Sequence, residues 1–234
     1  MIGTLYGIGV GPGDPELITL KGLRLLKSAA VVAYPAPETG DSLARAIVAD
    51  HLSGRQEEIA IRMPMLVNRF PAQDVYDRAA ADITVHLRAG RDVAVLCEGD
   101  GFLYGSFSFL YARLADDFPV QVVPGVSSLT ACAAVAGAPL ATRNDVLRVI
   151  PATLPETRLE AELTSVDAAA VMKLGRHFEK VRRVLERLDL ARTARYVEHA
   201  TMLSQDVRTL TEVDPASVPY FSMILVHRRG EAWR

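Results

Sequence analysis

The chain has 234 residues, half of them hydrophobic, and its formal net charge is −2 at pH 7. Such a chain can bury a sizeable core in one large or two small domains, which excludes wholesale disorder, and its slight negative charge disfavours a general nucleic-acid binder. Both cysteines stand in apolar stretches, the N-terminus lacks a secretion signal, and no apolar run reaches the ~18 residues of a membrane span. We therefore expect a cytoplasmic protein with neither a nucleic-acid nor a membrane partner.

The first half of the chain alternates strand-like and helix-like segments. Short apolar runs predict strands at 4–10, 29–34, 56–61, 92–97 and 120–123. Helical spacing of apolar residues predicts helices at 16–27, 43–52 and 74–89. The buried face of the first helix is expected to carry Leu17, Leu20, Leu23 and Leu26. Ser42 can cap the second helix, and Gly90 can end the third.

From about residue 126 the pattern changes to more strands and fewer helices. Strand-like runs occur at 147–150, 168–174, 194–199, 207–210 and 220–227. Helices are expected at 127–136 and 178–188, and the segment 153–165 is left unassigned. The expected fold class is α/β, with two α/β domains at residues 1–125 and 126–234. The first should hold a mostly parallel five-stranded sheet and the second a mixed sheet.

Glycine-rich segments follow three of the strands predicted in the first half. They occupy residues 9–14, 99–105 and 124–128. Ligands of open α/β sheets bind at the carboxyl ends of the strands, so the three loops are expected to contribute to one site.

The first of these loops, GIGVGPGD at residues 7–14, can bring its backbone close to a ligand because glycine tolerates positive φ. It does not match the dinucleotide fingerprint, since Pro12 and Pro15 interrupt the entry into a helix. It does not match a phosphate-binding P-loop either, because no Gly-Lys-Ser/Thr follows. The alternative to a ligand-binding loop is a tight strand-to-helix turn that is capped by Asp14.

The other two loops offer polar groups. Asp100 stands between two glycines and can accept hydrogen bonds from ribose hydroxyls or an ammonium group, or it can belong to an ordinary Asp-Gly turn. Ser127 and Ser128 present hydroxyls and amides at a predicted helix N-terminus. That arrangement suits a carboxylate, and it equally suits simple helix capping.

Three motifs together, GVGPGDPELITLKG at 9–22, GDGFLYG at 99–105 and VPGVSS at 123–128, resemble those of the tetrapyrrole methylase family. The resemblance implies an S-adenosylmethionine-dependent enzyme with the tetrapyrrole methylase fold, a cofactor cleft between its two domains and a homodimeric assembly. It assigns the substrate trough and part of the cofactor site to the first domain, and the rest of the cofactor site to the second.

Two positions depart from the family pattern. Most members have proline where this chain has Gly101, so we expect a more flexible second loop. Uroporphyrinogen methyltransferases have aspartate where this chain has Pro35, which disfavours that activity.

Transferred residue by residue, the resemblance implies a set of cofactor contacts. The first loop lies beneath the cofactor, the second lines its methionine and ribose parts, and the two serines face its methionine end. A strand and a turn of the second domain hold the adenine. The contacts implied are Pro12, Glu98, Gly99, Asp100, Leu103, Ser127, Ser128, Met172, Lys173, Leu174, Ala200 and Thr201.

Further stretches, VAYP at 32–35, IRMPM at 61–65 and MKLGR at 172–176, resemble the subgroup of precorrin-2 C(20)-methyltransferases. The implied activity is methylation of carbon 20 of precorrin-2, or of cobalt-factor II, giving precorrin-3A. This step belongs to cobalamin biosynthesis and, more broadly, to porphyrin biosynthesis. One alternative is another tetrapyrrole methylase, such as a precorrin-4 C(11) or uroporphyrinogen III methyltransferase. A non-catalytic nucleotide-binding protein is the other.

The chemistry suggests further residues. A sulfonium is already an activated methyl donor, so no metal is required, and the five histidines do not stand at ligand spacings.

The tetrapyrrole carries carboxylates, so basic groups are expected beside it, although any one arginine can instead be a solvated surface charge. The substrate contacts expected are Arg62, Met63, Met65, Arg143 and Arg176, with Arg69, Arg148 and His177 as further candidates. Core packing is the alternative for both methionines. The candidates for a proton acceptor are Asp100, Tyr104 and His199.

Overall fold

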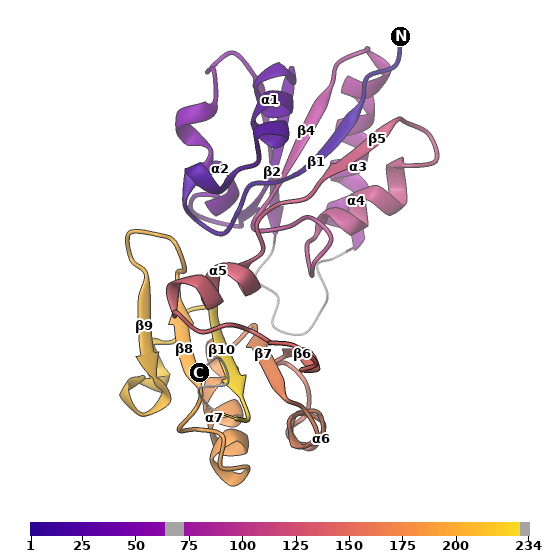
Figure 1. The fold of residues 1–234 in the computed structure, drawn as a ribbon. Coiled ribbons are helices and arrows are strands. Elements are labelled where there is room, and N and C mark those ends of the chain that lie inside the picture. Colours follow the sequence, from indigo (N-terminus) through magenta and orange to yellow (C-terminus); the bar gives the residue numbers. More distant parts are fainter. Residues whose placement is uncertain (64–72, 230–234) are drawn as a thin grey trace. The chain divides into compact units, whose positions relative to one another are not determined.

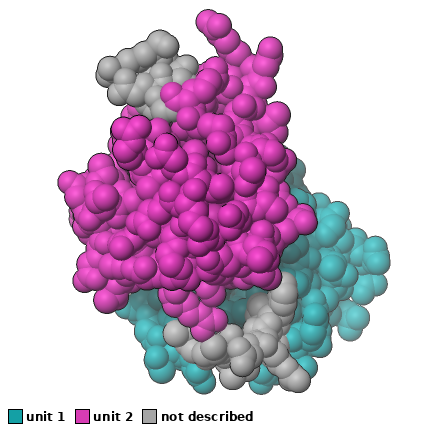
Figure 2. Space-filling view, turned by 90° about the horizontal axis from the view of Figure 1, so that it is seen from below, with its two compact units in different colours: residues 1–127 teal, residues 128–234 magenta. Residues whose placement is uncertain are grey.

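The computed structural model describes residues 1–63 and 73–229, and the chain forms two compact units (Figures 1 and 2). Unit 1 comprises Met1–Ser127 and unit 2 comprises Ser128–Arg234. Each unit has a five-stranded sheet with helices on both faces. The expected fold class, two α/β domains with a parallel and a mixed sheet, is confirmed.

Unit 1 is built on a parallel sheet with strand order β3-β2-β4-β1-β5. Its strands are β1 (Leu5–Gly9), β2 (Val31–Pro37), β3 (Glu57–Met63), β4 (Val93–Cys97) and β5 (Val120–Val123). Its helices are α1 (Leu20–Ser28), α2 (Leu43–Ile47), α3 (Gln73–Arg88) and α4 (Phe107–Leu114). α1 and α2 pack on one face of the sheet, and α3 and α4 on the other. The central strand β4 is therefore buried along its whole length.

β2 continues through two prolines that lie beyond the predicted strand 29–34. It pairs with β4 only from Val31 to Ala33, but with β3 as far as Pro37. Because proline has no N–H to donate, Pro35 and Pro37 fit where the strand has a neighbour on one side. The carbonyl of Pro35 accepts a hydrogen bond from Ser42 Oγ at 2.5 Å, and Ser42 caps α2 as predicted.

α1 begins later than predicted and buries a different face. Thr19 caps it by accepting a hydrogen bond from the Gly22 N–H at 3.0 Å, and Pro15–Leu17 forms a separate 3₁₀ turn. The predicted face is therefore partly wrong, since Leu20 is 87% exposed whereas Leu25 is buried. The cap sets where the helix starts, and leucine spacing counted across the 3₁₀ turn does not describe one continuous helix.

β3 forms one edge of this sheet and carries charged side chains. Glu57 pairs with Arg91 at 2.7 Å. Glu58 receives two hydrogen bonds from Arg45, at 2.8 and 2.9 Å, and a third from the Tyr34 hydroxyl at 2.8 Å. The Arg45 hydrogen bonds are the main cause that lowers the pKa of the Glu58 carboxyl. The acidic groups on this edge are thus neutralised by the chain's own cations.

Unit 2 is built on a mixed sheet with strand order β6-β7-β10-β8-β9, in which β6 and β7 are parallel and the other neighbours antiparallel. Its strands are β6 (Leu147–Pro151), β7 (Ala168–Met172), β8 (Arg195–Glu198), β9 (Asp206–Thr209) and β10 (Ser222–His227). Its helices are α5 (Ser128–Val135), α6 (Glu156–Thr164) and α7 (Phe178–Arg187). α5 packs on one face of the sheet, and α6 and α7 on the other. Among the described residues, no helix is long and apolar enough to cross a membrane.

Three strands of unit 2 end at the same edge of its sheet. β7 and β8 run in the same direction because each is antiparallel to β10, which lies between them. β6 is parallel to β7, and its last residue Pro151 lies opposite Met172. The first residue of β10, Ser222, lies opposite Glu198. The carboxyl ends of β6, β7 and β8 therefore share one edge, where ligands of α/β sheets are expected.

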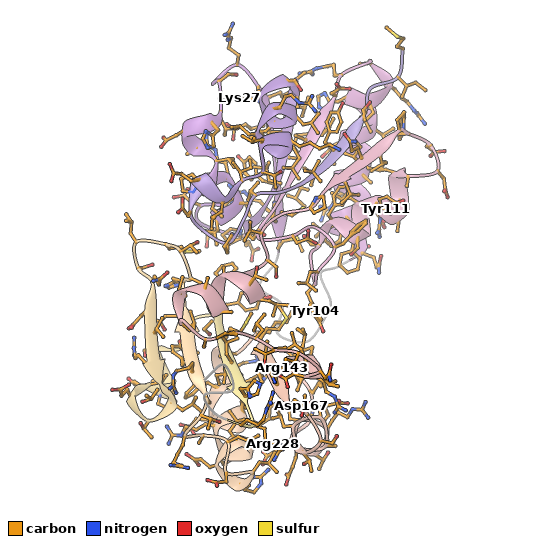
Figure 3. The ribbon with its side chains drawn as sticks, viewed as in Figure 1. Lys27, Tyr104, Tyr111, Arg143, Asp167 and Arg228 are labelled. Atoms are coloured by element: carbon orange, nitrogen blue, oxygen red, sulfur yellow. The ribbon has the colours of Figure 1, made fainter. Side chains whose placement is uncertain are left out.

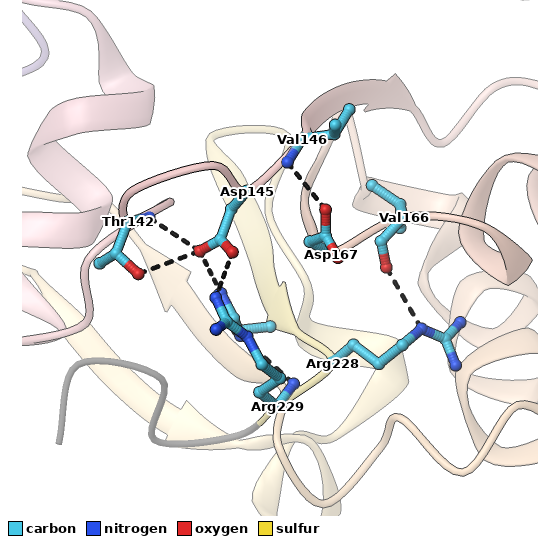
Figure 4. Close-up of polar contacts among 8 residues, drawn as sticks. Thr142, Asp145, Val146, Val166, Asp167, Arg228 and Arg229 are labelled. Atoms are coloured by element: carbon cyan, nitrogen blue, oxygen red, sulfur yellow. Dashed lines mark hydrogen bonds and ion pairs between the residues drawn. The ribbon is translucent and has the colours of Figure 1, made fainter.

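At the other end of β10, a buried carboxylate joins the end of the strand to the segment before β6 (Figure 4). Asp145 accepts hydrogen bonds from the Thr142 N–H at 2.8 Å and from His227 Nε2–H at 3.0 Å, and it also pairs with the Arg229 guanidinium. His227 Nδ1 in turn accepts from the Arg229 N–H at 3.3 Å. These contacts, the His227 hydrogen bond foremost, lower the pKa of Asp145 to about 2.

Acid is expected to destabilise unit 2 through Asp145. Its pKa lies below the ordinary value of 3.8, so the folded chain binds this proton less tightly than the unfolded chain does. The stabilisation is complete above pH 3.8 and is lost as the pH falls to about 2. Urea midpoints of the wild type should fall across this window. The Asp145→Asn variant should have a lower urea midpoint at neutral pH, and this midpoint should fall less in acid. Midpoints of the two proteins that fall in parallel with pH would contradict the expectation.

Candidate active site

The three glycine-rich loops of unit 1 start side by side at one edge of its sheet, as their positions in the sequence predict. They follow β1, β4 and β5, which are neighbours in the order β4-β1-β5. The registers place Gly9 opposite Cys97, and Ile8 opposite Val123. All three loops therefore leave the carboxyl ends of parallel strands, where α/β sheets bind ligands.

The glycines of these loops pack backbone against backbone. Gly99 N–H donates to Gly11 O at 2.7 Å, and Gly11 N–H donates to Gly99 O at 3.3 Å. A Cβ atom on Gly125 would lie 2.0 Å from Gly99 O, and a Cβ on Gly9 would lie 2.6 Å from the Gly125 nitrogen. We call Gly9, Gly11, Gly99 and Gly125 the glycine cluster. Glycine is required at Gly9 and Gly125 because the loops approach too closely for a side chain, and it suits Gly11 and Gly99 because their φ values are 86° and 64°.

Asp100 lies in the second loop and uses its carboxylate on backbone N–H groups. Oδ1 accepts hydrogen bonds from Phe102 N–H at 2.9 Å and from Leu103 N–H at 3.0 Å. Oδ2 accepts from Gly125 N–H, in the third loop, at 3.0 Å. The predicted site aspartate therefore joins two of the three loops.

Glu98 follows β4 directly and is the poorly solvated carboxyl of this edge. Burial raises its pKa, and backbone N–H groups of Glu98 and Ala44 oppose that shift. An ionised carboxylate in this position favours a positively charged neighbour. The adjacent Cys97 is buried, and burial together with the negative charges of Glu98 and Asp100 raises the pKa of its thiol. Cys97 is thus an unreactive core residue.

The Glu98→Gln variant is expected to be more stable than the wild type at neutral pH. The pKa of Glu98 is raised in the folded chain above 4.5, so the folded chain binds this proton more tightly and stability is lost as the pH rises from 4.5 through the raised pKa. Urea unfolding at pH 4.5 and at neutral pH should show this loss in the wild type and not in Glu98→Gln. Glu58→Gln is the matched control with the opposite sign, because the pKa of Glu58 is lowered.

The remaining predicted contacts of unit 1 lie on or beside the same loops. Pro12 is buried next to Gly11, which has a φ of 86°. Leu103 and Tyr104 are exposed, and Tyr104 has a φ of 56° in the left-handed region (Figure 3). Ser127 is the last residue of unit 1, and Ser128 is the first residue of α5.

The predicted contacts of unit 2 gather at the shared carboxyl edge of its sheet. Met172 is the last residue of β7, and Lys173 and Leu174 follow it. Ala200 and Thr201 lie just beyond the end of β8. Because β7 and β8 run in the same direction on either side of β10, the structure brings both segments to one edge.

The backbone of both segments is strained. Lys173, His199 and Thr201 have φ values of 60°, 48° and 70°, a region that residues other than glycine rarely adopt. The turn after β8 is held by the His199 N–H, which donates to Phe221 O at 3.0 Å, and by the Thr201 N–H, which donates to Gln205 Oε1 at 2.8 Å. Strain that is held in place this way clusters at functional sites.

Of the three proton-acceptor candidates, Asp100 and Tyr104 belong to unit 1 and His199 to unit 2.

Arg62, a predicted substrate contact, lines a cavity of about 360 Å³ between β3 and α3. Its Nη1 donates to Pro37 O at 3.0 Å, so it also holds the loop after β2. Arg78 of α3 lines the same cavity, together with the acidic Glu38 and Asp82. Arg78 is not among the predicted contacts, although its place on the polar face of the predicted helix 74–89 is a signal for an exposed cation.

The other predicted substrate contacts are spread over the chain. Met63 ends β3 and packs, half-buried, against the core beneath α3. Met65 and Arg69 lie outside the described residues. In unit 2, the exposed Arg143 (Figure 3) precedes β6, whereas Arg176 follows β7, so the two lie at opposite edges of the sheet. The structure does not bring Arg143 and Arg176 together.

The two further candidates of unit 2 differ in environment. Arg148 is paired with Glu162 at 3.0 Å, which links β6 to α6. His177 ends the 3₁₀ turn Gly175–His177 after β7, and burial, followed by the charges of Lys180 and Arg176, lowers its pKa.

Comparison with known proteins agrees with the family resemblance of the sequence motifs. A family model described as Tetrapyrrole (Corrin/Porphyrin) Methylases matches residues 4–214. The chain is 39% identical to a precorrin-2 C(20)-methyltransferase of Sinorhizobium sp, covering 96% of this chain and 95% of the relative. It is 35% identical to a cobalt-precorrin-2 C(20)-methyltransferase of Salmonella typhimurium, covering 99% of each.

A solved structure extends the likeness to the fold. Uroporphyrin-III C-methyl transferase from Thermus thermophilus, complexed with S-adenyl homocysteine, aligns with a TM-score of 0.71 at 25% identity, covering 97% of this chain and 98% of that one. With the family model spanning most of the chain, the fold and the relatives agree that this chain belongs to the tetrapyrrole (corrin/porphyrin) methylase family.

Proposed function

We propose that the chain methylates carbon 20 of precorrin-2, or of its cobalt-loaded counterpart, with S-adenosylmethionine as methyl donor, as a step of cobalamin biosynthesis. The observation that carries this proposal is the similarity, over nearly the whole chain, to relatives named precorrin-2 and cobalt-precorrin-2 C(20)-methyltransferase. The S-adenyl homocysteine in the Thermus relative supports the choice of cofactor.

The residues of both units fit this cofactor. Its sulfonium and ammonium groups are positive, and the poorly solvated Glu98 carboxylate favours such charges. The strained turns after β7 and β8 suit close backbone contact with a flat adenine ring. We assign the substrate trough and part of the cofactor site to unit 1, and the rest of the cofactor site to unit 2. The residues assigned are Pro12, Glu98, Gly99, Leu103, Ser127, Ser128, Met172, Lys173, Leu174, Ala200 and Thr201.

The proposed chemistry asks mainly for positioning. S-adenosylmethionine supplies an already activated methyl group, so the proposal includes no metal. The chain's residues must hold the methyl donor and the nucleophilic carbon in line and keep water out, which are the usual sources of rate in such transfers. The carbon that gains the methyl loses a proton, for which Tyr104 and His199 are the acceptors we propose to test.

The carboxylates of the substrate call for cations at the carboxyl ends of the strands. Arg62 follows this rule in unit 1, near the end of β3, and Arg176 follows it in unit 2, after β7. Arg143 lies at the opposite edge of the unit 2 sheet and is the weaker assignment. We further propose a homodimer that works in the cytoplasm, which sedimentation of the purified chain and cell fractionation would test.

The test is to locate the new methyl group. The chain is incubated with S-adenosylmethionine carrying a carbon-13 methyl and, in separate reactions, with metal-free precorrin-2 and its cobalt-loaded counterpart. Carbon NMR of the products should show one new methyl at carbon 20, and the better substrate identifies the metal-free or the cobalt route. Reactions without the chain are the control.

Other outcomes would identify another activity. A new methyl at carbon 11, or turnover of uroporphyrinogen III instead, would mean a different tetrapyrrole methylase. Binding of S-adenosylhomocysteine in calorimetry without turnover of any tetrapyrrole would mean a nucleotide-binding protein.

A further inference from the structure

We infer that Asp100 is a positioning residue, whose carboxylate holds the loop after β4 against the loop after β5 and thereby shapes the site before any ligand arrives. The loop contact itself stands independently of the proposed function. Its consequence for S-adenosylmethionine rests on that proposed function. This role differs from the direct cofactor contact that the family resemblance implies for Asp100.

One carboxylate makes both a local and a distant connection. Oδ1 closes the second loop on itself by accepting from the N–H groups of Phe102 and Leu103, at 2.9 and 3.0 Å. Oδ2 accepts from the Gly125 N–H at 3.0 Å, across 25 positions of sequence. A carboxylate offers about four acceptor positions, so three backbone N–H groups use most of them.

The distant connection falls at the tightest point of the glycine cluster. Gly125 packs so closely on Gly99 and Gly9 that a Cβ atom would lie 2.0 Å from Gly99 O and 2.8 Å from Gly9 Cα. The Gly125 N–H donates a charge-assisted hydrogen bond to Asp100 Oδ2, which satisfies this donor and holds the third loop in place.

The local connection bears on Gly101, where the family resemblance implies a more flexible loop. In this chain, Asp100 holds the two residues that follow, Phe102 and Leu103, through their N–H groups. The rigidity is thus supplied by a side chain one residue earlier.

Asparagine at position 100 separates the two connections. An amide has the size of the carboxylate but only one oxygen, and its nitrogen donates. In Asp100→Asn the oxygen can serve Gly125 or the pair Phe102 and Leu103, while the NH₂ group faces the other N–H donors. One connection must therefore be lost without any change in side-chain volume.

The first measurement is amide hydrogen exchange of the full-length, nitrogen-15-labelled chain without any ligand. In Asp100→Asn, either the Gly125 amide or the Phe102 and Leu103 amides should lose protection and exchange about tenfold faster or more, because a hydrogen bond to a charged group is lost. Exchange in β10 of unit 2 and the urea midpoint serve as checks on global stability. Asp14→Asn is the matched control, since that carboxylate accepts from the nearby Glu16 N–H in the first loop.

The second measurement separates positioning from direct contact. Asp100→Asn should bind S-adenosylhomocysteine more weakly in calorimetry and raise the KM for S-adenosylmethionine, with an unchanged KM for the tetrapyrrole. If cofactor affinity falls while the three amides of the free protein exchange as in the wild type, Asp100 is a direct ligand and the inference is overturned. If the wild type itself binds no S-adenosylhomocysteine, the proposed function fails, and the exchange data still decide the loop connection.

Discussion

Replacing Gly125 with alanine is expected to abolish cofactor binding. The new Cβ would lie 2.0 Å from Gly99 O and 2.8 Å from the Gly9 carbonyl carbon, and all of these neighbours are backbone atoms that cannot rotate away. The Gly99 segment is itself held by its paired hydrogen bonds with Gly11. The loops after β1, β4 and β5 must therefore move apart. Calorimetry with S-adenosylhomocysteine should show no measurable binding by Gly125→Ala.

Gly101→Ala, in the neighbouring second loop, is the matched control. A Cβ atom there would lie 3.4 Å from Cys97 Sγ and 3.6 Å from Phe107 Cβ, which are ordinary contacts. Cofactor binding should persist, and stability should rise by about 0.4–1 kcal/mol because the unfolded chain loses freedom. Equal affinities of the Gly125→Ala and Gly101→Ala variants would show that the close approach of the loops is not needed for binding.

Replacing Phe178 with alanine is expected to cost about 3–5 kcal/mol of stability, the range for buried phenylalanines. Phe178 is 1% exposed and packs edge-on against the ring of Tyr196, with centroids 5.7 Å apart. It starts α7 directly after the turn that follows β7, and Tyr196 precedes the turn that follows β8. The cavity left behind would thus undermine both strained turns of unit 2.

Urea unfolding followed by tyrosine and peptide signals would measure this loss. The control is Phe221→Ala in the same unit, because Phe221 is 43% exposed and its ring therefore leaves water less completely on folding than that of Phe178. Its truncation should cost less than about 1 kcal/mol. Similar losses for both variants would mean that the Phe178–Tyr196 contact does not hold the core of unit 2.

Much of the fold could be predicted because its signals are local. The five strands of unit 1 are short apolar runs, and the structure places a strand within each predicted segment or overlapping it. Gly90 ends α3 with a φ of 77°, in the left-handed conformation that a glycine C-cap requires. The mixed character of the unit 2 sheet followed from the shortage of helices between its strands.

α4 carries a local signal but was not predicted from the sequence. Its buried residues Phe107, Leu110 and Leu114 have helical spacing, yet no helix is predicted there. The helix follows a glycine loop directly, and Ser106 makes no side-chain capping hydrogen bond that would mark its start. Without a cap or a polar boundary, the segment looks like a continuation of the loop.

The site shows a different limit. Sequence order placed the three loops at strand ends, but it could not give the partners of their side chains. Asp100 meets Gly125 across 25 positions, and Asp145 meets His227 across 82. Such pairings are decided by how the strands and loops pack, so a carboxylate that looks like a ligand in the sequence can belong to the framework.

The charged side chains of the edge strand β3 affect whether the unit 1 sheet can pair with a strand of another molecule. An exposed edge strand offers unpaired backbone groups to any other strand, and is a common starting point for aggregation. On β3, Glu57, Glu58 and Arg62 stand exposed, and a second strand pairing there would have to strip water from these charges. Edge-to-edge growth of the unit 1 sheet is therefore disfavoured.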